Sequence, residues 1–466
     1  MSDDILFMSA SELVERYRDQ SLSPVEVTRA TLERISAIDE NMNAYIVVDG
    51  DSALDAAGQS EQRWRDGEPL GLVDGVPTSI KDLVLAKGWP TLFGSKTTDP
   101  EQAWQDDAPS VARLREHGAV IIGKTTTPEF GWKGVTDSAV SGITRNPWNL
   151  EKTPGGSSGG AAAAIAAGMC HLAIGTDGGG SIRIPSGFSG TFGLKPSFGR
   201  VPAWPMGRFG TLGHVGPITR TAEDAALMLT VISQPDHRDW TALPHDKRDY
   251  RDGLDQGVEG LRVAYSPDLG YADVDQEITE VTSRAADAFA DLGADVVRAD
   301  PGFGDPKVAF RTLWWAGAAN GLRRLTEEQM KLVEPGLAEI VSVGRKIPLL
   351  DYIAADNERS VLGEIMMEFH QTYDLLLTPS LAVAAFQTGT LTPRESDDPK
   401  WITWSPFTYP FNMTKQPAAS VPCGFTSDGL PVGLQIVGPM FADHLVLQAS
   451  YAYQRAFPLT DRRPPI

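Results

Sequence analysis

Cysteine is almost absent from this chain of 466 residues, which holds only Cys170 and Cys423. Two cysteines so far apart give neither a disulfide framework nor a paired metal-binding motif, and free thiols are typical of a reducing compartment. No run of about 18 apolar residues occurs, so the sequence predicts no transmembrane helix. The acidic residues 1–4 lack the pattern of a signal peptide. These absences predict a cytoplasmic protein that does not bind a membrane.

Positive charge is also scarce. The chain has 41 Lys and Arg residues against 61 Asp and Glu residues, which gives a formal net charge of −20. Such an acidic chain argues against general binding to nucleic acids or anionic membranes. The seven histidines show no metal-ligand spacing, so the sequence predicts no metal site. A length of 466 residues permits two or three domains, but a large α/β fold can also form one.

Glycine, in contrast, is concentrated between Lys152 and Arg200, in two groups that each carry serine. The first group is Gly155 to Gly160 and the second is Gly178 to Ser181, with an alanine-rich segment and a β-like run between them. Backbone amides in glycine-rich turns can converge on an anion or on the oxyanion of a reaction intermediate. A serine among such amides, here Ser181, is therefore the candidate nucleophile.

Three interpretations of this stretch are open from the residues alone. Two tight turns could simply enclose a buried helix. Phosphate binding is disfavoured, because neither glycine group is followed by the Gly-Lys-Ser/Thr sequence of a nucleotide-binding loop. Hydrolase chemistry is the third interpretation. Residues 155–159 match the G-x-S-x-G pattern of a nucleophile elbow, but the polar residues 149–154 do not form the apolar strand that precedes such an elbow.

The stretch closely resembles the amidase signature family, in which a Ser–cis-Ser–Lys triad cleaves amides. The matching segments are Gly155–Gly160, Gly175–Asp177, Gly179–Arg183, Pro185 and Gly193–Pro196, together with Ile80–Asp82 further upstream. The resemblance implies that Ser181 is the nucleophile and that Lys81 is the base. It also implies that Ser157 follows a cis peptide bond and bridges the two.

Further roles follow from the resemblance and from amide chemistry. Lys81 can accept a proton only when neutral, and burial would lower its pKa toward that form. The amides of Gly178, Gly179, Gly180 and Ser181 are expected to form the oxyanion hole. We assign Ser158, Asp177 and Arg183 to supporting positions around the triad. This chemistry requires no metal and no organic cofactor.

Hydrophobic periodicity predicts alternating strands and helices, and therefore an α/β fold. Strands are expected at 44–48, 119–122, 171–176, 260–266, 294–299 and 374–379, and helices at 52–65, 110–117, 222–232 and 277–292, among others. The resemblance implies one amidase domain over residues 1–466, with a single large mixed β-sheet flanked by helices. It also implies a signature core at about 70–225 and a variable helical region at about 303–373 that supplies pocket walls. One departure is Lys415, where relatives usually have glycine.

The substrate pocket is predicted to be apolar. Its candidate wall residues are large side chains in segments that can border the site: Phe130, Trp132, Ile184, Trp204, Met206, Trp314 and Trp315. Burying apolar ligand surface against them would gain about 25 cal/mol per Å². No charge is expected there to hold a free carboxylate, so apolar or aryl amides should outcompete glutamine as substrates. For each aromatic residue the alternative is a place in the core.

The sequence therefore predicts an amidase that hydrolyses a carboxylic amide to a carboxylate and an amine or ammonia through a serine acyl-enzyme. One alternative is the A subunit of a glutamine-dependent aminoacyl-tRNA amidotransferase, which shares the triad but normally has glutamine where this chain has Ile184. A second alternative is a non-catalytic scaffold on the amidase fold, against which the intact triad argues. The predicted partner is a small-molecule amide, and a homodimer is left open.

Overall fold

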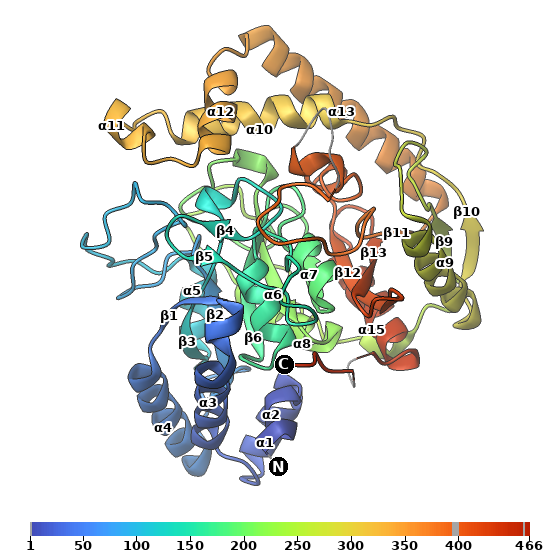
Figure 1. The fold of residues 1–466 in the computed structure, drawn as a ribbon. Coiled ribbons are helices and arrows are strands. Elements are labelled where there is room, and N and C mark those ends of the chain that lie inside the picture. Colours follow the sequence, from blue (N-terminus) through green and yellow to red (C-terminus); the bar gives the residue numbers. More distant parts are fainter. Residues whose placement is uncertain (1, 394–399, 460–461) are drawn as a thin grey trace.

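The computed structural model describes residues 2–393, 400–459 and 462–466. Within these residues, eleven strands form one mixed sheet in the order β1-β3-β2-β6-β8-β7-β12-β13-β11-β9-β10, with helices on both sides (Figure 1). The strands are β1 Tyr45–Val48, β2 Pro77–Lys81, β3 Val120–Thr125, β6 Leu172–Asp177, β7 Phe192–Lys195, β8 His214–Thr219, β9 Arg262–Tyr265, β10 Asp295–Arg298, β11 Leu375–Pro379, β12 Ala418–Phe425 and β13 Pro431–Val437. A small separate hairpin pairs β4 Asp137–Ser138 with β5 Gly142–Ile143. The prediction of a single large mixed sheet flanked by helices is confirmed.

The helices follow the predicted alternation with strands over most of the chain. They are α1 Ser2–Phe7, α2 Ala10–Arg18, α3 Pro24–Met42, α4 Gly50–Asp66, α5 Pro109–Glu116, α6 Gly159–Ala166, α7 Arg183–Ser189, α8 Ala222–Ile232, α9 Gln276–Asp291, α10 Lys307–Gly321, α11 Glu327–Met330, α12 Pro335–Gly344, α13 Leu349–Thr372, α14 Pro410–Met413 and α15 Asp443–Ala456. Short 3-10 turns occur at Glu129–Gly131, Gly210–Leu212, Leu254–Gln256 and Trp401–Thr403. In the part of the chain described, no helix is both long and apolar enough to cross a membrane.

The centre of the sheet determines where the chemistry can occur. Strand β2 is parallel to both β3 and β6, so the carboxyl ends of these strands meet at one edge. Lys81 is the last residue of β2, and Asp177 is the last residue of β6. Strand β8 runs antiparallel to β6 and brings His214 opposite Asp177. The topology therefore gathers segments distant in sequence around the end of β6.

Two large apolar clusters support this edge from different directions. The first packs the sheet against α2, α8, α9 and α15, through residues such as Leu13, Leu227, Phe289 and Leu447. The second joins α10, α12 and α13 to Phe130, through residues such as Phe310, Trp314, Leu337 and Leu362. Helices α10, α11, α12 and α13 lie together at the top of Figure 1, beyond the edge where β2 and β6 end. The predicted helical region thus covers the site-bearing edge.

Helix starts follow local chemistry. At Ser23 both halves of a capping box form, because its hydroxyl accepts from a backbone amide and Glu26 accepts from the Ser23 amide. At Ser9 only the serine half forms, with the Glu12 amide donating to the hydroxyl over 3.0 Å. The Glu12 carboxylate instead accepts from Arg16 at 2.9 Å. An i,i+4 ion pair thus replaces the return bond of this capping box.

The sequence patterns do not predict β7 and β8 as strands. Both are short, and both are interrupted by residues that weaken strand propensity, namely Gly193 in β7 and Gly216-Pro217 in β8. They form because neighbours on each side supply the backbone hydrogen bonds. Residues 235–257 form an irregular segment that contains the short 3-10 turn at Leu254–Gln256.

Glycine allows α6 to approach the neighbouring strands closely. A Cβ atom on Gly160 would lie 2.6 Å from the Ala44 carbonyl oxygen and 2.6 Å from the Thr126 amide nitrogen. Both are backbone atoms that cannot move aside locally. Gly58 in α4 offers the opposite case, because a Cβ atom there would meet nothing within 4 Å. An alanine at Gly160 therefore tests the close packing of the helix, whereas an alanine at Gly58 tests helix propensity alone.

We expect Gly160→Ala to lower the free energy of unfolding by roughly 1–3 kcal/mol, because the added methyl group overpacks the contact between α6 and the β1–β3 region. Gly58→Ala should instead raise it by about 0.5–1 kcal/mol, since alanine is the better helix former. Urea denaturation followed by circular dichroism measures both. Equal stabilisation by the two substitutions would contradict the close approach at Gly160.

Candidate active site

Lys81 lies fully buried at the end of β2, among hydroxyl groups. Its Nζ atom donates to Ser157 Oγ at 2.7 Å, to Ser158 Oγ at 2.8 Å and to Thr176 Oγ1 at 2.9 Å. Hydroxyl oxygens solvate an amine without fixing its charge, because a hydroxyl can either accept from the nitrogen or donate to it. The arrangement therefore suits a lysine that changes protonation state.

Burial lowers the pKa of Lys81 well below its ordinary value, while the negative charge of Asp177 opposes this shift. Desolvation disfavours the ammonium form, and none of the three hydroxyls restores a full counter-charge. The neutral amine that a general base requires is therefore favoured. This agrees with the role that the sequence resemblance implies for Lys81.

Ser157 precedes α6, and the peptide bond between Gly156 and Ser157 is cis, as the resemblance predicts. Gly131 packs against it, so that a Cβ atom on Gly131 would lie 3.1 Å from Ser157 Oγ. The next residue, Ser158, donates its backbone amide to the Ser181 carbonyl oxygen at 3.1 Å. This bond ties the two serine-bearing glycine segments together. It places the predicted bridging serine and the predicted nucleophile on adjoining backbone.

Ser181 follows three glycines that differ in what their amides do. The Gly180 amide donates to Asp177 Oδ1 at 2.7 Å, so it is already engaged and does not point to an oxyanion. Of the four amides expected to form the oxyanion hole, that of Gly180 is thus bound within the loop, which leaves those of Gly178, Gly179 and Ser181 as candidates. Gly178 and Ser181 line the cavity described below. A Cβ atom on Gly178 would lie 2.9 Å from the Trp314 ring, which explains the glycine there.

Asp177 and Arg183 form a fully buried, bidentate ion pair beneath this loop. Arg183 Nε lies 3.0 Å from Asp177 Oδ2, and Arg183 Nη2 lies 3.0 Å from Asp177 Oδ1. The remaining donors of the guanidinium reach Thr408 O, Gln435 Oε1 and Asn412 Oδ1 at 2.6–2.8 Å. Arg183 and further hydrogen bonds hold the pKa of Asp177 well below its usual range, against the effect of burial. Every oxygen of this carboxylate is engaged, which fixes the loop from 177 to 183.

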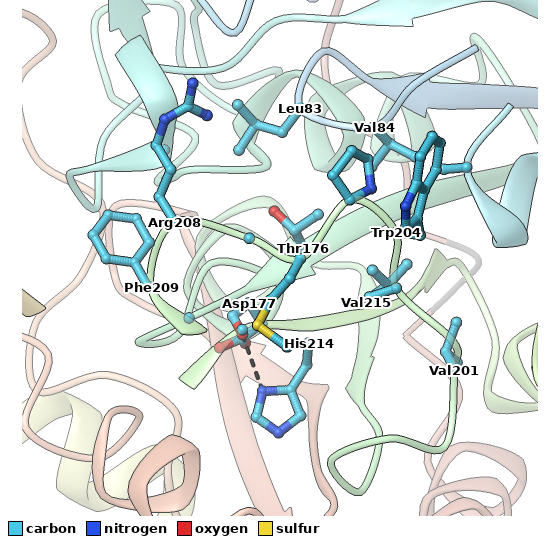
Figure 2. Close-up of a pocket in the computed structure, with 18 of the residues that line it drawn as sticks. Leu83, Val84, Thr176, Asp177, Val201, Trp204, Arg208, Phe209, His214 and Val215 are labelled. Carbon is cyan, nitrogen blue, oxygen red and sulfur yellow. Dashed lines mark hydrogen bonds between the residues drawn. The ribbon is translucent and has the colours of Figure 1, made fainter. Parts of the chain in front are cut away.

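His214 lies beside the same ion pair and hydrogen-bonds to backbone carbonyl groups. Its Nδ1 atom lies 2.9 Å from Leu212 O and 3.2 Å from Asp177 O, the latter contact being dashed in Figure 2. Burial lowers the pKa of His214 well below its ordinary value, so the ring is neutral and Nδ1 carries the proton that it donates. These contacts give the histidine a structural role.

A cavity of about 420 Å³ opens above the triad residues. Ser157, Thr176 and Ser181 contribute to its floor, and Figure 2 shows Thr176 and Asp177 at the base of the lining side chains. Four predicted wall residues line it, namely Phe130, Trp204, Met206 and Trp314. Phe209 stacks on Trp314, with ring centroids 3.5 Å apart and planes within 5°. The wall is therefore largely aromatic and aliphatic, as expected.

Three predicted wall residues lie elsewhere. Trp132 is buried with its Nε1 atom donating to Glu334 at 2.8 Å, and Trp315 lies under the guanidinium of Arg311 away from the main cavity. Ile184 is fully buried against Gly155 and Gly180, because the first turn of α7 directs it into the core. The adjacent tryptophans 314 and 315 thus diverge around α10, and only the first reaches the cavity.

Arg208 corrects the expectation that the pocket wall carries no charge. It lines the cavity, and its guanidinium carbon lies 4.0 Å from the centroid of the Phe130 ring. No motif marks this arginine in the sequence, so periodicity and spacing do not reveal it. Thr176, which supplies the third hydroxyl on Lys81, could have been found, because it precedes Asp177 in the matched G-T-D segment.

Metal ligands are a separate question. Across residues 2–393, 400–459 and 462–466, no three His, Cys, Asp or Glu side chains gather in a manner that could hold a metal ion. Asp177, the acidic residue at the base of the cavity, has its oxygens occupied by Arg183, Asn412 and backbone amides.

Comparison with known proteins gives the family. The family model for amidases matches residues 26–447. The chain belongs to the amidase signature family. A bacterial aryl acylamidase of this family has a crystal structure that matches with a TM-score of 0.91 and 34% identity, covering 98% of this chain and 97% of that one. As a member of the family, the chain is a hydrolase that acts on amide C–N bonds.

Two curated relatives differ in what they are named for. An acylamidase of Rhodococcus erythropolis is 38% identical over 470 residues, which cover 98% of this chain and 97% of that protein. The A subunit of the glutamyl-tRNA(Gln) amidotransferase of Syntrophobacter fumaroxidans is 34% identical over 478 residues, with 96% and 97% covered. The amidase interpretation and the amidotransferase alternative thus both have relatives over nearly the whole chain, and the acylamidase has the higher identity of the two.

The buried pair between Asp177 and Arg183 yields a stability prediction. Arg183→Met should lower the free energy of unfolding by about 3–5 kcal/mol, because it leaves the Asp177 carboxylate buried without its counter-ion. A matched control is Arg262→Met, which breaks the ion pair with Asp374, where the arginine side chain is 49% exposed. That change should cost far less, because an exposed ion pair contributes little to stability. Urea denaturation of both variants gives the comparison, and similar midpoints would contradict the role assigned to the buried pair.

Proposed function

We propose that this amidase cleaves apolar or aryl amides through an acyl-enzyme on Ser181, with Ser157 and Lys81 as the proton relay. The observation that carries the proposal is the buried Lys81 amine, which binds three hydroxyls beneath a largely apolar cavity that Ser157, Thr176 and Ser181 line. The names of the acylamidase and aryl acylamidase relatives support the choice of substrate class.

In the proposed first step, Ser181 Oγ attacks the amide carbonyl carbon. Its proton passes to Ser157 Oγ, while the Ser157 proton passes to the neutral amine of Lys81. The C–N bond then breaks, and the proton returns by the same route to the departing nitrogen, which leaves as an amine or ammonia. Water repeats the sequence on the ester of Ser181 and releases the carboxylate. The contact of 2.7 Å between Lys81 Nζ and Ser157 Oγ supports the second link of this relay.

The negative charge that develops on the carbonyl oxygen needs donors held in position. We assign these donors to the backbone amides of Gly178, Gly179 and Ser181. The Asp177 carboxylate supports this assignment indirectly, because it accepts from the amides of Gly180 and Ile182 and so fixes the turn on which the other donors lie. Loss of one such donor typically raises the barrier by about 3 kcal/mol.

Preference for apolar or aryl groups is proposed from the cavity wall. Phe130, Trp204, Met206, Phe209 and Trp314 offer apolar surface to a substrate. Each Å² of apolar ligand surface buried against them gains about 25 cal/mol. The amidotransferase alternative remains testable with glutamine itself. An anilide that proved a much poorer substrate than glutamine would favour that alternative.

Other parts of the prediction belong to this proposal. A single amidase domain over residues 1–466 is supported by one sheet that takes strands from both halves of the chain. The signature core at about 70–225 accounts for Lys81, Ser157 and Ser181, and the helical region at about 303–373 supplies Trp314. The cytoplasmic location stays a prediction from the sequence, and a homodimer stays open.

Ser181→Ala should abolish turnover of an anilide, since no other group on the proposed route forms the acyl-enzyme. Aniline release measures activity, and circular dichroism checks that the fold is unchanged. A serine-reactive phosphonate should label Ser181 in the unmodified protein, as peptide mass mapping would reveal. Labelling at Ser157 instead, with Ser181→Ala still active, would reverse the assignment.

The lowered pKa of Lys81 gives a pH prediction. Below that pKa the lysine is an ammonium ion and cannot accept the serine proton, so kcat/KM should rise with pH through the lysine pKa and then level off. Lys81→Ala should remove this limb and lower kcat/KM by ~1,000-fold or more. A pH–rate series on an anilide tests both points. An unchanged profile in the variant would exclude Lys81 as the base.

A further inference from the structure

The cavity contains a cation that the proposed mechanism does not use. Arg208 lies in the loop between Trp204 and Gly210, and its guanidinium carbon sits 4.0 Å from the centroid of the Phe130 ring and 5.0 Å from that of Phe93. Cation–π contacts of this kind are weak compared with an ion pair in a buried site. They hold the guanidinium in place without neutralising it.

The Glu129 carboxylate, whose charge favours the protonated form of Arg208, is already hydrogen-bonded to other residues. Burial lowers the pKa of Arg208 to about 10, with Glu129 opposing the shift, so the side chain stays charged at neutral pH. The Glu129 carboxylate accepts from Ser95 Oγ at 2.5 Å and from the Glu334 amide at 2.6 Å. Among the described residues, the buried Nε atom of Arg208 has no hydrogen-bond partner.

Helix α10 has two glycines where Arg208 packs against it. A Cβ atom on Gly321 would lie 2.7 Å from Arg208 Cγ, and one on Gly317 would lie 3.2 Å from the Arg208 carbonyl oxygen. The neighbouring Phe209 is held by its stack on Trp314. Figure 2 shows Arg208 and Phe209 together on one side of the cavity. Two glycines and one aromatic stack therefore fix the stem, and the position of the guanidinium is built into the wall.

The guanidinium is connected to the reacting groups through two adjacent residues. It covers Phe130, and the next residue, Gly131, packs against Ser157 Oγ. A substrate whose carbonyl carbon meets Ser181 can therefore extend along Phe130 toward Arg208. A planar guanidinium with free donors matches the geometry of a carboxylate, which it can bind with two parallel hydrogen bonds.

We propose that Arg208 binds a carboxylate on the substrate, so that the preferred amides carry an apolar or aryl body and an anionic end. The proposal rests on the amidase function proposed above and narrows its substrate class. It also explains why a largely aromatic and aliphatic wall retains a cationic side chain that is costly to desolvate. A substrate carboxylate paired with the arginine would offset this desolvation penalty.

The test compares substrates that differ only in charge. One pair is 4-acetamidobenzoate and 4-acetylacetanilide, and the other is glutaric acid monoanilide and the anilide of 5-oxohexanoic acid. In each pair an acetyl group replaces the carboxylate at similar size. Unmodified enzyme should give a higher kcat/KM for the carboxylate member of at least one pair. Absence of such a preference in both pairs overturns the proposal without any variant.

Arg208→Gln should lower kcat/KM for the preferred carboxylate by about 10- to 100-fold, the range expected for a hydrogen-bonded charge. The neutral partner should change less than about threefold. Arg238→Gln is the matched control, because that guanidinium also covers a cavity-wall ring, Trp204 at 4.7 Å, but is paired with Asp236. It should leave the ratio of carboxylate to neutral substrate unchanged.

The possible outcomes distinguish a failure of this inference from a failure of the proposed function on which it rests. If the unmodified enzyme does not cleave any of these amides, to release aniline, 4-aminobenzoate or 4-aminoacetophenone, the proposed function fails. If it does, and Arg208→Gln lowers both members of a pair equally, Arg208 is a structural part of the wall and only the carboxylate proposal is wrong.

Discussion

The buried ion pair between Asp177 and Arg183 is the constraint on which the candidate site depends. It joins the end of β6 to the first turn of α7, and its outer hydrogen bonds reach Asn412 and Gln435 in the second half of the chain. The Gly180 and Ile182 amides also end on Asp177. A glycine-rich loop would otherwise be free to adopt many conformations. Here one carboxylate with no unused oxygen determines the path of the loop that presents Ser181.

The same pair shapes the electrostatics around Lys81. An isolated carboxylate near a buried lysine would stabilise the ammonium form and raise its pKa. Asp177 acts in that direction, but its charge is matched by Arg183 within the bidentate contact, and burial remains the larger effect on Lys81. The three hydroxyl contacts then hold the amine in place without adding charge. A structural ion pair thus permits a nearby lysine to be neutral.

Much of this arrangement could be predicted from the residues, and the limits have physical causes. Lys81, Ser157 and Ser181 fall in motifs, and the cis bond before Ser157 is confirmed. The single mixed sheet is also confirmed. Strand β8 is not predicted, because Gly216 and Pro217 lower its local strand propensity. It forms nevertheless, because pairing with a strand distant in sequence overrides that weak propensity. The pocket wall was harder to predict. Trp314 and Trp315 differ only in their angle around α10, and Arg208 reaches the cavity through a loop without a repeating pattern.

Lys415 occupies a position where glycine is expected, and its surroundings hold the backbone there. It stands where relatives usually have glycine, and it adopts the left-handed conformation, with φ of 65°. Its carbonyl accepts from the Phe198 amide, and its ammonium lies 4.8 Å from the centroid of the Phe198 ring. These contacts hold a backbone shape that glycine would adopt without them. At this departure from the family pattern, a lysine therefore adopts a backbone conformation that glycine adopts readily.

The loop between Trp204 and Gly210 rests on α10, whereas the hydroxyls around Lys81 come from the loop before α6 and from β6. The two sets of residues occupy different segments of the chain. Natural variation in the loop and in α10 could therefore broaden or redirect the range of accepted amides while the bond-breaking groups stay unchanged. This modular division makes the same surface a suitable region for directed evolution libraries.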